Sequence, residues 1–274
     1  MHLGLYLIIF FMQTTTLFSY SFRKILSPTR SIVIRYMSSE KSETVINLEN
    51  VVSRILNTEE RAERVHGSVT LVAVSKTKPA VAIQELYDAG HRIFGENYAQ
   101  ELVEKAADLP KDIDWHYIGT LQSKKAKTLV RDVPNLKCIE TVDSEKLAMK
   151  INNACESCGR SQPLDIFIQI DTSGEDTKSG IPASEATSLA TFIREKCPFL
   201  KFKGVMTIGA PGDLSCFDRL KECRNDIASF FHIDPDDLAL SMGMSGDFEE
   251  AIERGATHVR VGSTIFGARD YSMK

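Results

Sequence analysis

Residues 165–171 read DIFIQID, and residues 71–74 read LVAV. The second run is wholly apolar, and the first is apolar at Ile166, Phe167, Ile168 and Ile170, so apolar side chains are nearly continuous instead of standing only at alternate positions. Alternation is typical of a strand with one face in water, whereas a near-continuous apolar run is typical of a parallel strand that helices cover. The two runs therefore predict a parallel sheet buried inside an α/β protein.

Short runs of this kind alternate with helical patterns from Ser68 onward. The expected strands are residues 69–75, 92–96, 115–119, 138–142, 165–171, 202–208, 238–244 and 257–266. The expected helices between them are residues 80–89, 98–108, 124–131, 144–153, 183–196, 216–230 and 247–253. Eight βα units predict a closed (β/α)8 TIM barrel, and an open doubly wound sheet is the alternative.

The domain organisation follows from the absence of internal linkers. No stretch rich in Pro, Gly and Ser divides residues 43–274, so we expect one barrel domain there and a targeting or disordered extension over residues 1–42. Residues 43–66 carry apolar side chains suited to one broad face and predict an extra amphipathic helix before the first strand. In a barrel, we expect this helix to cover the end opposite the active site.

The composition is that of an ordinary globular protein. Hydrophobic residues make up 43% and charged residues 26%, which excludes a disordered or fibrous chain. The 33 basic and 37 acidic side chains give a net charge of −4, without the basic surplus of proteins that bind nucleic acid or anionic membranes. We therefore expect neither class. Six Cys without repeating spacing do not make a disulfide scaffold.

The first 39 residues contain no Asp or Glu, and their basic residues are Arg23, Lys24, Arg30 and Arg35. The apolar run over residues 3–12 is about half the length that spans a bilayer, so we expect no stable membrane insertion. An acid-poor leader with Arg and Ser is typical of a mitochondrial transit peptide, and translation from Met37 or a membrane anchor are the alternatives. We expect a cytoplasmic or mitochondrial protein, or one found in both compartments.

Barrel active sites lie at the C-terminal ends of the strands, and the last two predicted strands end in residues suited to phosphate. Ser245-Gly246 and Gly262-Ser263-Thr264 offer hydroxyl groups and Gly residues that let a ligand approach the backbone. Ser245-Gly246 also opens a helix whose N–H groups favour an anion. The alternative is that these residues are only helix caps and tight turns.

Lys76 is a candidate nucleophile at the end of the first strand. Val72, Val74 and Lys76 share one face by period-two alternation, so Lys76 projects from the barrel mouth if that face points inward. Partial desolvation there lowers the pKa of the amine, which can then form a Schiff base with an aldehyde. A lysine and a phosphate site in one mouth favour pyridoxal phosphate, and a solvated lysine is the alternative. Lys78 competes for this role, but it precedes Pro79 and is expected to point outward.

Five motifs occur in order and with compatible spacing. They are VSKTKP at 74–79, FGENY at 94–98, WHYIG at 115–119 followed by QSKK at 122–125, LSMGMS at 240–245, and RVGSTIFG at 260–267. Together they resemble the pyridoxal-phosphate homeostasis protein family over about residues 45–272. The resemblance implies a single-domain barrel, similar to the N-terminal domain of bacterial alanine racemase, that carries pyridoxal phosphate on a lysine.

The resemblance also implies the residues that bind the cofactor. They are Lys76 as the Schiff-base lysine; Ser245, Gly246, Gly262, Ser263 and Thr264 at the phosphate; Asn97 and Met206 in the ring pocket; and Arg260 near the pyridine nitrogen. Arg can only donate a hydrogen bond, so at that nitrogen it disfavours the protonated ring that an aminotransferase uses. The alternative for Arg260 is an ion pair with a barrel carboxylate such as Asp171 or Glu96.

The implied function is storage, buffering or delivery of the cofactor, with pyridoxal-phosphate-dependent apoenzymes as candidate recipients and without robust catalysis. A racemase needs a second base, which similar racemases take from an additional C-terminal domain, and we expect no such domain after the short tail of this chain. Tyr271 is the formal candidate for that base in the tail. A weak amino-acid racemase or another pyridoxal-phosphate enzyme is the alternative. We expect a monomer without a metal site.

Three further groups of residues carry weaker signals. Cys155 and Cys158 form a lone CxxC, and zinc would need more ligands, so free thiols are expected. His116 lies inside a strand and is expected to be packed and hydrogen-bonded. The lysines at 124, 125 and 127 are interpreted as a solvated face or as a contact with a partner or an anion.

Overall fold

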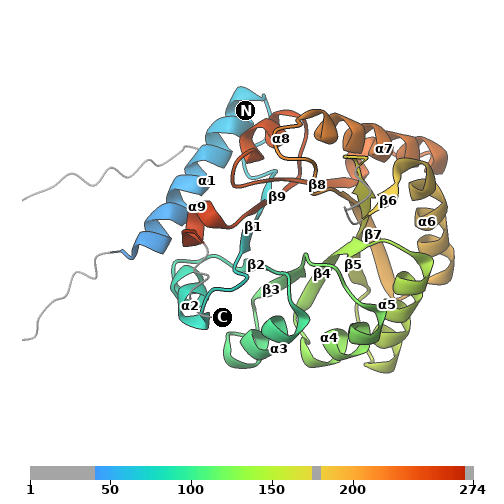
Figure 1. Ribbon diagram of the computed structural model, residues 1–274, viewed down its shortest axis with the longest axis horizontal. Helices are drawn as coiled ribbons and strands as arrows, with labels where there is room; N and C mark the ends of the chain where they lie inside the picture. Colours follow the sequence, from blue (N-terminus) through green and yellow to red (C-terminus); the bar gives the residue numbers. More distant parts are fainter. Residues whose placement is uncertain (1–40, 175–179, 269–274) are drawn as a thin grey trace, which may run out of the picture. The chain divides into compact units, whose positions relative to one another are not determined.

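Eight parallel strands close into a barrel in the computed structural model, which describes residues 41–174 and 180–268 (Figure 1). The strands are β1 (Thr70–Val74), β2 (Ile93–Glu96), β3 (Asp114–Tyr117), β4 (Leu136–Val142), β5 (Leu164–Asp171), β7 (Leu200–Met206), β8 (Ala239–Met244) and β9 (His258–Val261). They follow one another around the barrel in chain order, and pairing between β4 and β5 closes it. The predicted (β/α)8 barrel is confirmed, and the open sheet is wrong.

Helices surround the strands. They are α2 (Ala80–Asp88), α3 (Ala99–Asp108), α4 (Ala126–Asp132), α5 (Glu145–Ser157), α6 (Ala183–Lys196), α7 (Ser215–Phe231) and α8 (Phe248–Glu253), with single 3₁₀ turns η1 (Ser123–Lys125) and η2 (Pro235–Asp237). Leu71 and Ala73 belong to the core between strands and helices. Val72 points into the barrel, where it lies against Gly95 of the neighbouring strand β2. A Cβ atom added to Gly95 would lie only 2.8 Å from Val72 Cγ1. The alternation predicted along β1 is therefore correct.

The extra helix α1 (Glu43–Arg61) does not cover the end of the barrel opposite the site, so that prediction is wrong. It lies in the outer ring and packs against α2, α8 and the short α9 (Ser263–Phe266) (Figure 1). An Arg54 Nη2 to Glu249 Oε2 ion pair of 2.6 Å joins it to α8, and Asn47 Nδ2 donates to the Ile265 carbonyl of α9 at 3.3 Å. Because α9 has only four residues, it leaves room in the ring that α1 fills.

α1 also ends earlier than residue 66. The Glu59 carboxylate is buried and accepts hydrogen bonds from the backbone N–H groups of Gly67 at 2.8 Å and Val69 at 2.7 Å. Glu63 adopts a φ of 54°, in the left-handed region, so the chain leaves the helix axis. These contacts turn the chain back toward β1 within a few residues.

The last predicted strand was too long. β9 ends at Val261, and the residues Ser263–Phe266 form α9, in which the N–H groups of Ile265 and Phe266 donate to the Gly262 carbonyl at 2.9 Å. The two-residue strand β6 (Ile181–Pro182), which pairs with β5, was not predicted. All six cysteines are free thiols, and among the described residues no helix has the length and apolar content needed to cross a membrane.

The expectations for most of the N-terminal extension, residues 1–40, and for Tyr271 lie outside the described residues. The residues from Lys41 onward group into one compact unit.

Candidate functional site at the barrel mouth

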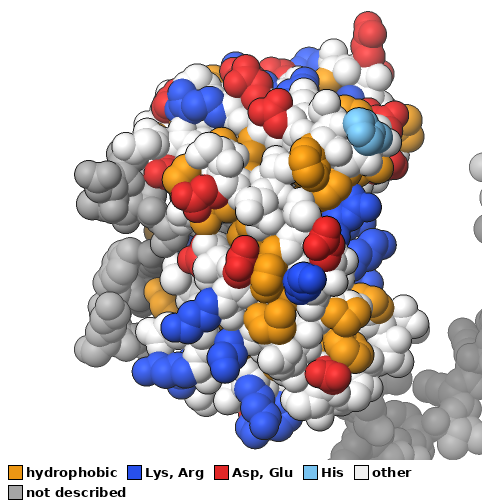
Figure 2. Space-filling view, turned by 90° about the vertical axis from the view of Figure 1, so that its right-hand side faces the viewer, with side chains coloured by type: hydrophobic (Ala, Val, Ile, Leu, Met, Phe, Trp, Pro, Cys, Tyr) orange, Lys and Arg blue, Asp and Glu red, His pale blue; other side chains and the backbone are white. Residues whose placement is uncertain are grey.

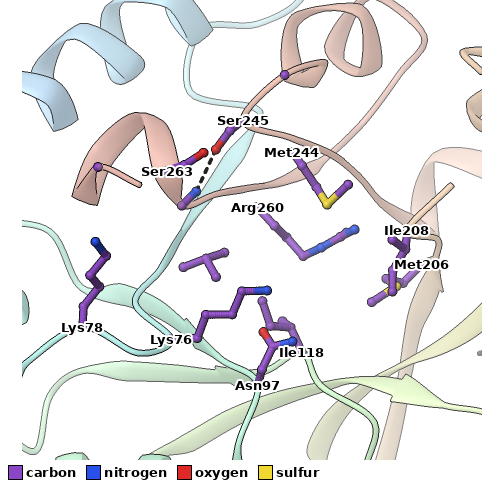
Figure 3. A pocket seen from close by; sticks show the side chains of 14 residues that line it. Lys76, Lys78, Asn97, Ile118, Met206, Ile208, Met244, Ser245, Arg260 and Ser263 are labelled. Atoms are coloured by element: carbon purple, nitrogen blue, oxygen red, sulfur yellow. Dashed lines mark hydrogen bonds between the residues drawn. The ribbon is translucent and has the colours of Figure 1, made fainter. Parts of the chain in front are cut away.

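A cavity of about 330 Å³ opens at the C-terminal ends of the strands. Its walls are Val74, Lys76, Lys78, Asn97, Ile118, Met206, Ile208, Met244, Ser245, Gly246, Arg260, Gly262, Ser263 and Gly267. Figure 3 shows Lys76 and Arg260 reaching into one space, with Ser245 and Ser263 on one side and Asn97 and Ile118 on another. The volume falls within the range of small-molecule sites.

Eight of the nine residues singled out from the sequence line this cavity, and Thr264 does not. Its N–H and its hydroxyl instead contact Ser245, each at 3.4 Å. Lys78, expected to point outward, does line the cavity, and its Nζ donates to the Ala268 carbonyl at 2.8 Å. The reason is a turn at Thr77, whose φ of 62° brings the chain back toward the mouth.

Sequence reasoning found Met206 but missed the rest of the apolar part of the wall. The missed residues are Val74, Ile118, Ile208, Met244 and Gly267. Val74 could have been found, because it shares the inward face of β1 with Lys76. The others carry no chemical signal in their residue types, since Ile and Met are common throughout protein cores.

One side of the cavity is built from backbone N–H groups and hydroxyls. The N–H groups of Gly262 and Thr264 both donate to Ser245 Oγ, at 3.1 and 3.4 Å (Figure 3 draws the first). A Cβ on Gly262 would come within 3.3 Å of Val74, so a side chain there would crowd the wall. Among the described residues no Asp or Glu lines the cavity, whereas two lysines and an arginine do. This wall fits a phosphate group.

Asn97 supplies a polar atom to the cavity wall. Its Oδ1 is buried and accepts no hydrogen bond within the described part of the chain. Buried polar atoms are nearly always paired, so an orphaned acceptor in a cavity wall fits a ligand that carries a hydrogen-bond donor. Pyridoxal phosphate has such a donor in its ring hydroxyl. Together with Lys76 and the wall described above, the residues present fit this cofactor.

Arg260 enters the cavity from β9 and is held from behind. Its Nη1 donates to Ser241 Oγ at 2.7 Å, and its Nη2 donates to the Thr207 carbonyl at 2.7 Å. Ser241 Oγ in turn donates to Glu140 Oε2 at 2.6 Å, and Arg260 Nη1 lies 4.0 Å from the same oxygen. The alternative expected for Arg260, an ion pair with a barrel carboxylate, is therefore present, but its partner is Glu140 on β4 and not the suggested Asp171 or Glu96.

Glu140 is the fully buried anion of the barrel interior. Burial alone would raise the pKa of its carboxyl, but the hydrogen bond from His116 and the charges of His116 and Arg260 lower that pKa to about 2. The His116 Nδ1 to Glu140 Oε1 distance is 2.6 Å, which confirms His116 as a packed, hydrogen-bonded histidine. The side-chain atoms of His116, Cys138 and Glu140 that could bind a metal ion lie within 4.8 Å of one another. Both carboxylate oxygens of Glu140 are already engaged in hydrogen bonds, one with His116 and one with Ser241.

Comparison with known proteins gives a consistent result. Residues 46–270 match the family model described as alanine racemase, N-terminal domain. A pyridoxal phosphate homeostasis protein of Mus musculus is 50% identical over 216 residues, which cover 74% of this chain and 78% of the relative.

Two solved structures are also similar. An unknown protein from Bifidobacterium adolescentis has a TM-score of 0.74 at 36% identity, covering 82% of this chain and 94% of the other. PipY of Synechococcus elongatus, solved with pyridoxal phosphate bound, has a TM-score of 0.67 at 29% identity, covering 82% of this chain and 100% of PipY.

Proposed function

This chain belongs to the alanine racemase N-terminal domain family and, within it, to the pyridoxal phosphate homeostasis proteins, and on this premise we propose that it binds pyridoxal 5′-phosphate and acts in the homeostasis of that cofactor. One observation carries the proposal. An amine, a buried guanidinium and a wall of N–H and hydroxyl groups meet in one cavity at the barrel mouth. The amine matches the aldehyde of the cofactor, the guanidinium matches its pyridine ring, and the wall matches its phosphate.

The residues of the cavity divide the binding among them. The amine of Lys76 would add to the cofactor aldehyde with loss of one water, which leaves the cofactor as a Schiff base on this side chain. Ser245, Gly262 and Ser263 would hold the phosphate through hydroxyl and N–H donors. Asn97 would accept a hydrogen bond from the ring hydroxyl.

Arg260 would set the electronic state of the ring. It is buried, with 4% of its surface exposed, and two of its nitrogens are fixed by Ser241 and Thr207. A guanidinium has no proton acceptor, so it cannot keep the pyridine nitrogen protonated as a carboxylate does in an aminotransferase. A carrier needs no such activation.

We propose a carrier rather than a robust enzyme. A racemase uses one base on each face of the cofactor, and the only ionisable side chains that line the cavity within the described ranges are those of Lys76, Lys78 and Arg260. The Nζ of Lys78 donates to the Ala268 carbonyl, which holds it at the cavity edge. This contact favours the carrier, and the alternative, a weak racemase, would need Lys78 to leave that carbonyl and act as its second base.

The test is the absorption spectrum of purified protein before and after borohydride, for wild type and Lys76→Ala. We expect a band near the violet edge of the visible in wild type, its loss in Lys76→Ala, and trapping of the cofactor on the peptide that contains Lys76. A reducible band that survives in Lys76→Ala would assign the cofactor to another lysine, with Lys78 first. Solvent-proton exchange at the α-carbon of an amino acid, lost in Lys76→Ala, would favour the enzyme.

We further propose that the cofactor is handed directly to apoenzymes, through contact beside the barrel mouth. Lys124, Lys127, Lys146 and Lys150 line a groove of about 600 Å³ between α4 and α5, here called the lysine groove, which no described Asp or Glu lines. Figure 2 turns the α5–α6 side toward the viewer, and basic side chains gather on its lower part. At the cavity edge, Ile208 and Met244 are 44% and 36% exposed. An acidic protein surface with an apolar centre would fit this face.

The compartment and the oligomeric state complete the proposal. Residues 1–36 hold four basic and no acidic side chains, which supports import into mitochondria for chains that begin at Met1 and residence in the cytoplasm for chains that begin at Met37. N-terminal sequencing of the protein from each compartment tests this. We propose a monomer, which light scattering tests.

A further inference from the structure

The turn that carries Lys76 is strained. The N–H of Lys78 donates to the Ser75 carbonyl at 3.0 Å, so Lys76 and Thr77 are the two central residues of a β-turn. Thr77 has a φ of 62°, the left-handed conformation that the third position of a type II turn reserves for Gly or Asn. A β-branched residue is found there only when its surroundings hold it.

Two residues of α3 hold this turn. The Thr77 N–H donates to Glu101 Oε1 at 2.6 Å, and the Lys105 ammonium donates to the same oxygen at 2.6 Å. Lys105 also donates to the Ser75 carbonyl at 2.8 Å. The backbone on both sides of Lys76 is thus tied to one helix, although the Lys76 side chain itself reaches into the cavity (Figure 3).

The third hydrogen bond of the Lys105 ammonium goes to Glu96 on β2. Lys105 Nζ donates to Glu96 Oε1 at 2.7 Å, and Ser75 Oγ donates to the same oxygen at 2.6 Å. Lys105 is 7% exposed and Glu96 is fully buried, so the ammonium has used its three protons on fixed acceptors. Burial raises the pKa of Glu96 to about 7, while Lys105 and Ser75 favour its ionised form.

We propose that Glu101 and Lys105 are positioning residues for Lys76, which fix the strained turn so that the Lys76 amine is directed into the cavity. The inference rests on the proposed function of Lys76 as the cofactor lysine. Neither residue lines the cavity, so neither would touch the cofactor. Their effect on binding would pass through the backbone of residues 75–77.

The experiment compares Glu101→Ala with Glu101→Gln, with Thr77→Gly and with the double variant Glu101→Ala/Thr77→Gly. Gln keeps an oxygen that accepts the Thr77 N–H, and Gly adopts a positive φ without strain. Glu104→Ala is the matched control, because Glu104 is an exposed acid of the same helix that accepts a hydrogen bond from Gln100 Nε2 at 3.0 Å.

Two quantities are measured. One is the dissociation constant for pyridoxal phosphate, and the other is the rate at which an amine reagent labels Lys76 in the cofactor-free protein, followed by peptide mass spectrometry. We expect roughly tenfold weaker binding and a changed labelling rate in Glu101→Ala, because losing the contact releases the strained turn. We expect near-wild-type values in Glu101→Gln and Glu104→Ala, and recovery in the double variant.

Unchanged affinity and labelling in Glu101→Ala would overturn the inference, as would a loss that Thr77→Gly does not recover. A melting temperature that falls in Glu101→Ala while both quantities stay at the wild-type value would show a merely structural contact. Lys105→Met is expected to weaken binding of pyridoxal phosphate as well. If Lys105→Met does not fold, the results for Glu101→Ala alone test the inference. If wild type binds no cofactor, the proposed function fails, whereas the labelling of Lys76 still tests the positioning role.

Discussion

The position of the Arg260 side chain depends on residues from distant parts of the chain. Its guanidinium is fixed through Ser241 on β8, the carbonyl of Thr207 after β7, and Glu140 on β4 behind them. Period-two alternation predicts which side chains enter a barrel, but the register between strands decides which of them meet. This is why the sequence suggested Asp171 or Glu96 as the partner of Arg260, and why the carboxylate present is Glu140.

The site residues that carry motifs were predictable, and those that only shape the cavity were not. Lys76, Asn97 and Arg260 stand in short segments whose residue types are tied to chemistry, and all three line the cavity. Ile118 and Ile208 line it too, but an isoleucine at a strand end looks the same whether it faces a ligand or a core. Lys78 was misplaced because the left-handed conformation of Thr77 leaves no mark in the sequence.

His258 gives a prediction at the scale of one titrating group. Burial lowers the pKa of its imidazole to about 4, whereas an unfolded histidine titrates near 6.5. The unfolded chain therefore binds a proton first as the pH falls, and stability that is complete above about pH 6.5 is lost as the pH falls toward about 4. We expect His258→Gln to remove this part of the acid sensitivity, which amounts to roughly 2–3 kcal/mol at pH 4.5.

The measurement is the free energy of urea unfolding at pH 7.5 and pH 4.5 for wild type, His258→Gln and the exposed control His66→Gln. His66 lies on the surface, so its variant should keep the pH dependence of wild type. If the free energy of unfolding falls equally between pH 7.5 and pH 4.5 in wild type and in His258→Gln, the prediction is contradicted.

At the scale of elements, the outer ring departs from a regular βα repeat at one point. The pattern of the sequence predicted α1, but its place depends on α9 being too short to cover β9 and β1. The residues VGSTIF at 261–266 favour a strand by composition, and the turn at Gly262 that starts α9 was not visible in them. One misread ending thus produced both errors, the long strand and the misplaced helix.

If α1 is part of the ring, removing its buried side chains should destabilise the whole barrel. Ile55 is 4% exposed, so Ile55→Ala is expected to lower the free energy of unfolding by roughly 2–5 kcal/mol. Val52 on the same helix is 38% exposed, and Val52→Ala is expected to change it by less than about 0.5 kcal/mol. Denaturant unfolding followed by circular dichroism measures both, and equally small effects would mean that α1 unfolds separately.

At the scale of the whole molecule, charge is distributed unevenly. Residues 1–36 contain four of the 33 basic side chains and none of the 37 acidic ones, so the remaining chain carries a net charge of −8. Against this background, one end of the lysine groove is formed by Ser123 and Lys124. The next residue, Lys125, lines a second surface depression together with Asn97 of the cavity wall, so the groove begins close to the mouth. A local basic surface on an acidic protein would steer an acidic partner to this side.

The corresponding prediction concerns transfer of the cofactor. We expect Lys127→Gln/Lys150→Gln to slow transfer to the apo form of an acidic aminotransferase several-fold at low salt, and high salt to slow wild type similarly. Activity recovery of the aminotransferase gives the rate, with a phosphatase present to remove cofactor that escapes into solution. The control is Lys196→Gln/Lys221→Gln, two exposed lysines on α6 and α7. Equal transfer rates in both double variants would exclude the lysine groove as the contact surface for transfer.

The position of α1 has a consequence for the newly made chain. α1 leaves the ribosome before every other described helix, yet α8 and α9, which it packs against, are synthesised about 200 residues later, and β1 pairs with β9 over the same separation. At 5–20 residues per second, its apolar side chains wait roughly ten seconds or more for their partners. The barrel can close only after translation is nearly complete, so a truncated nascent chain would be a substrate for chaperones rather than a partial fold.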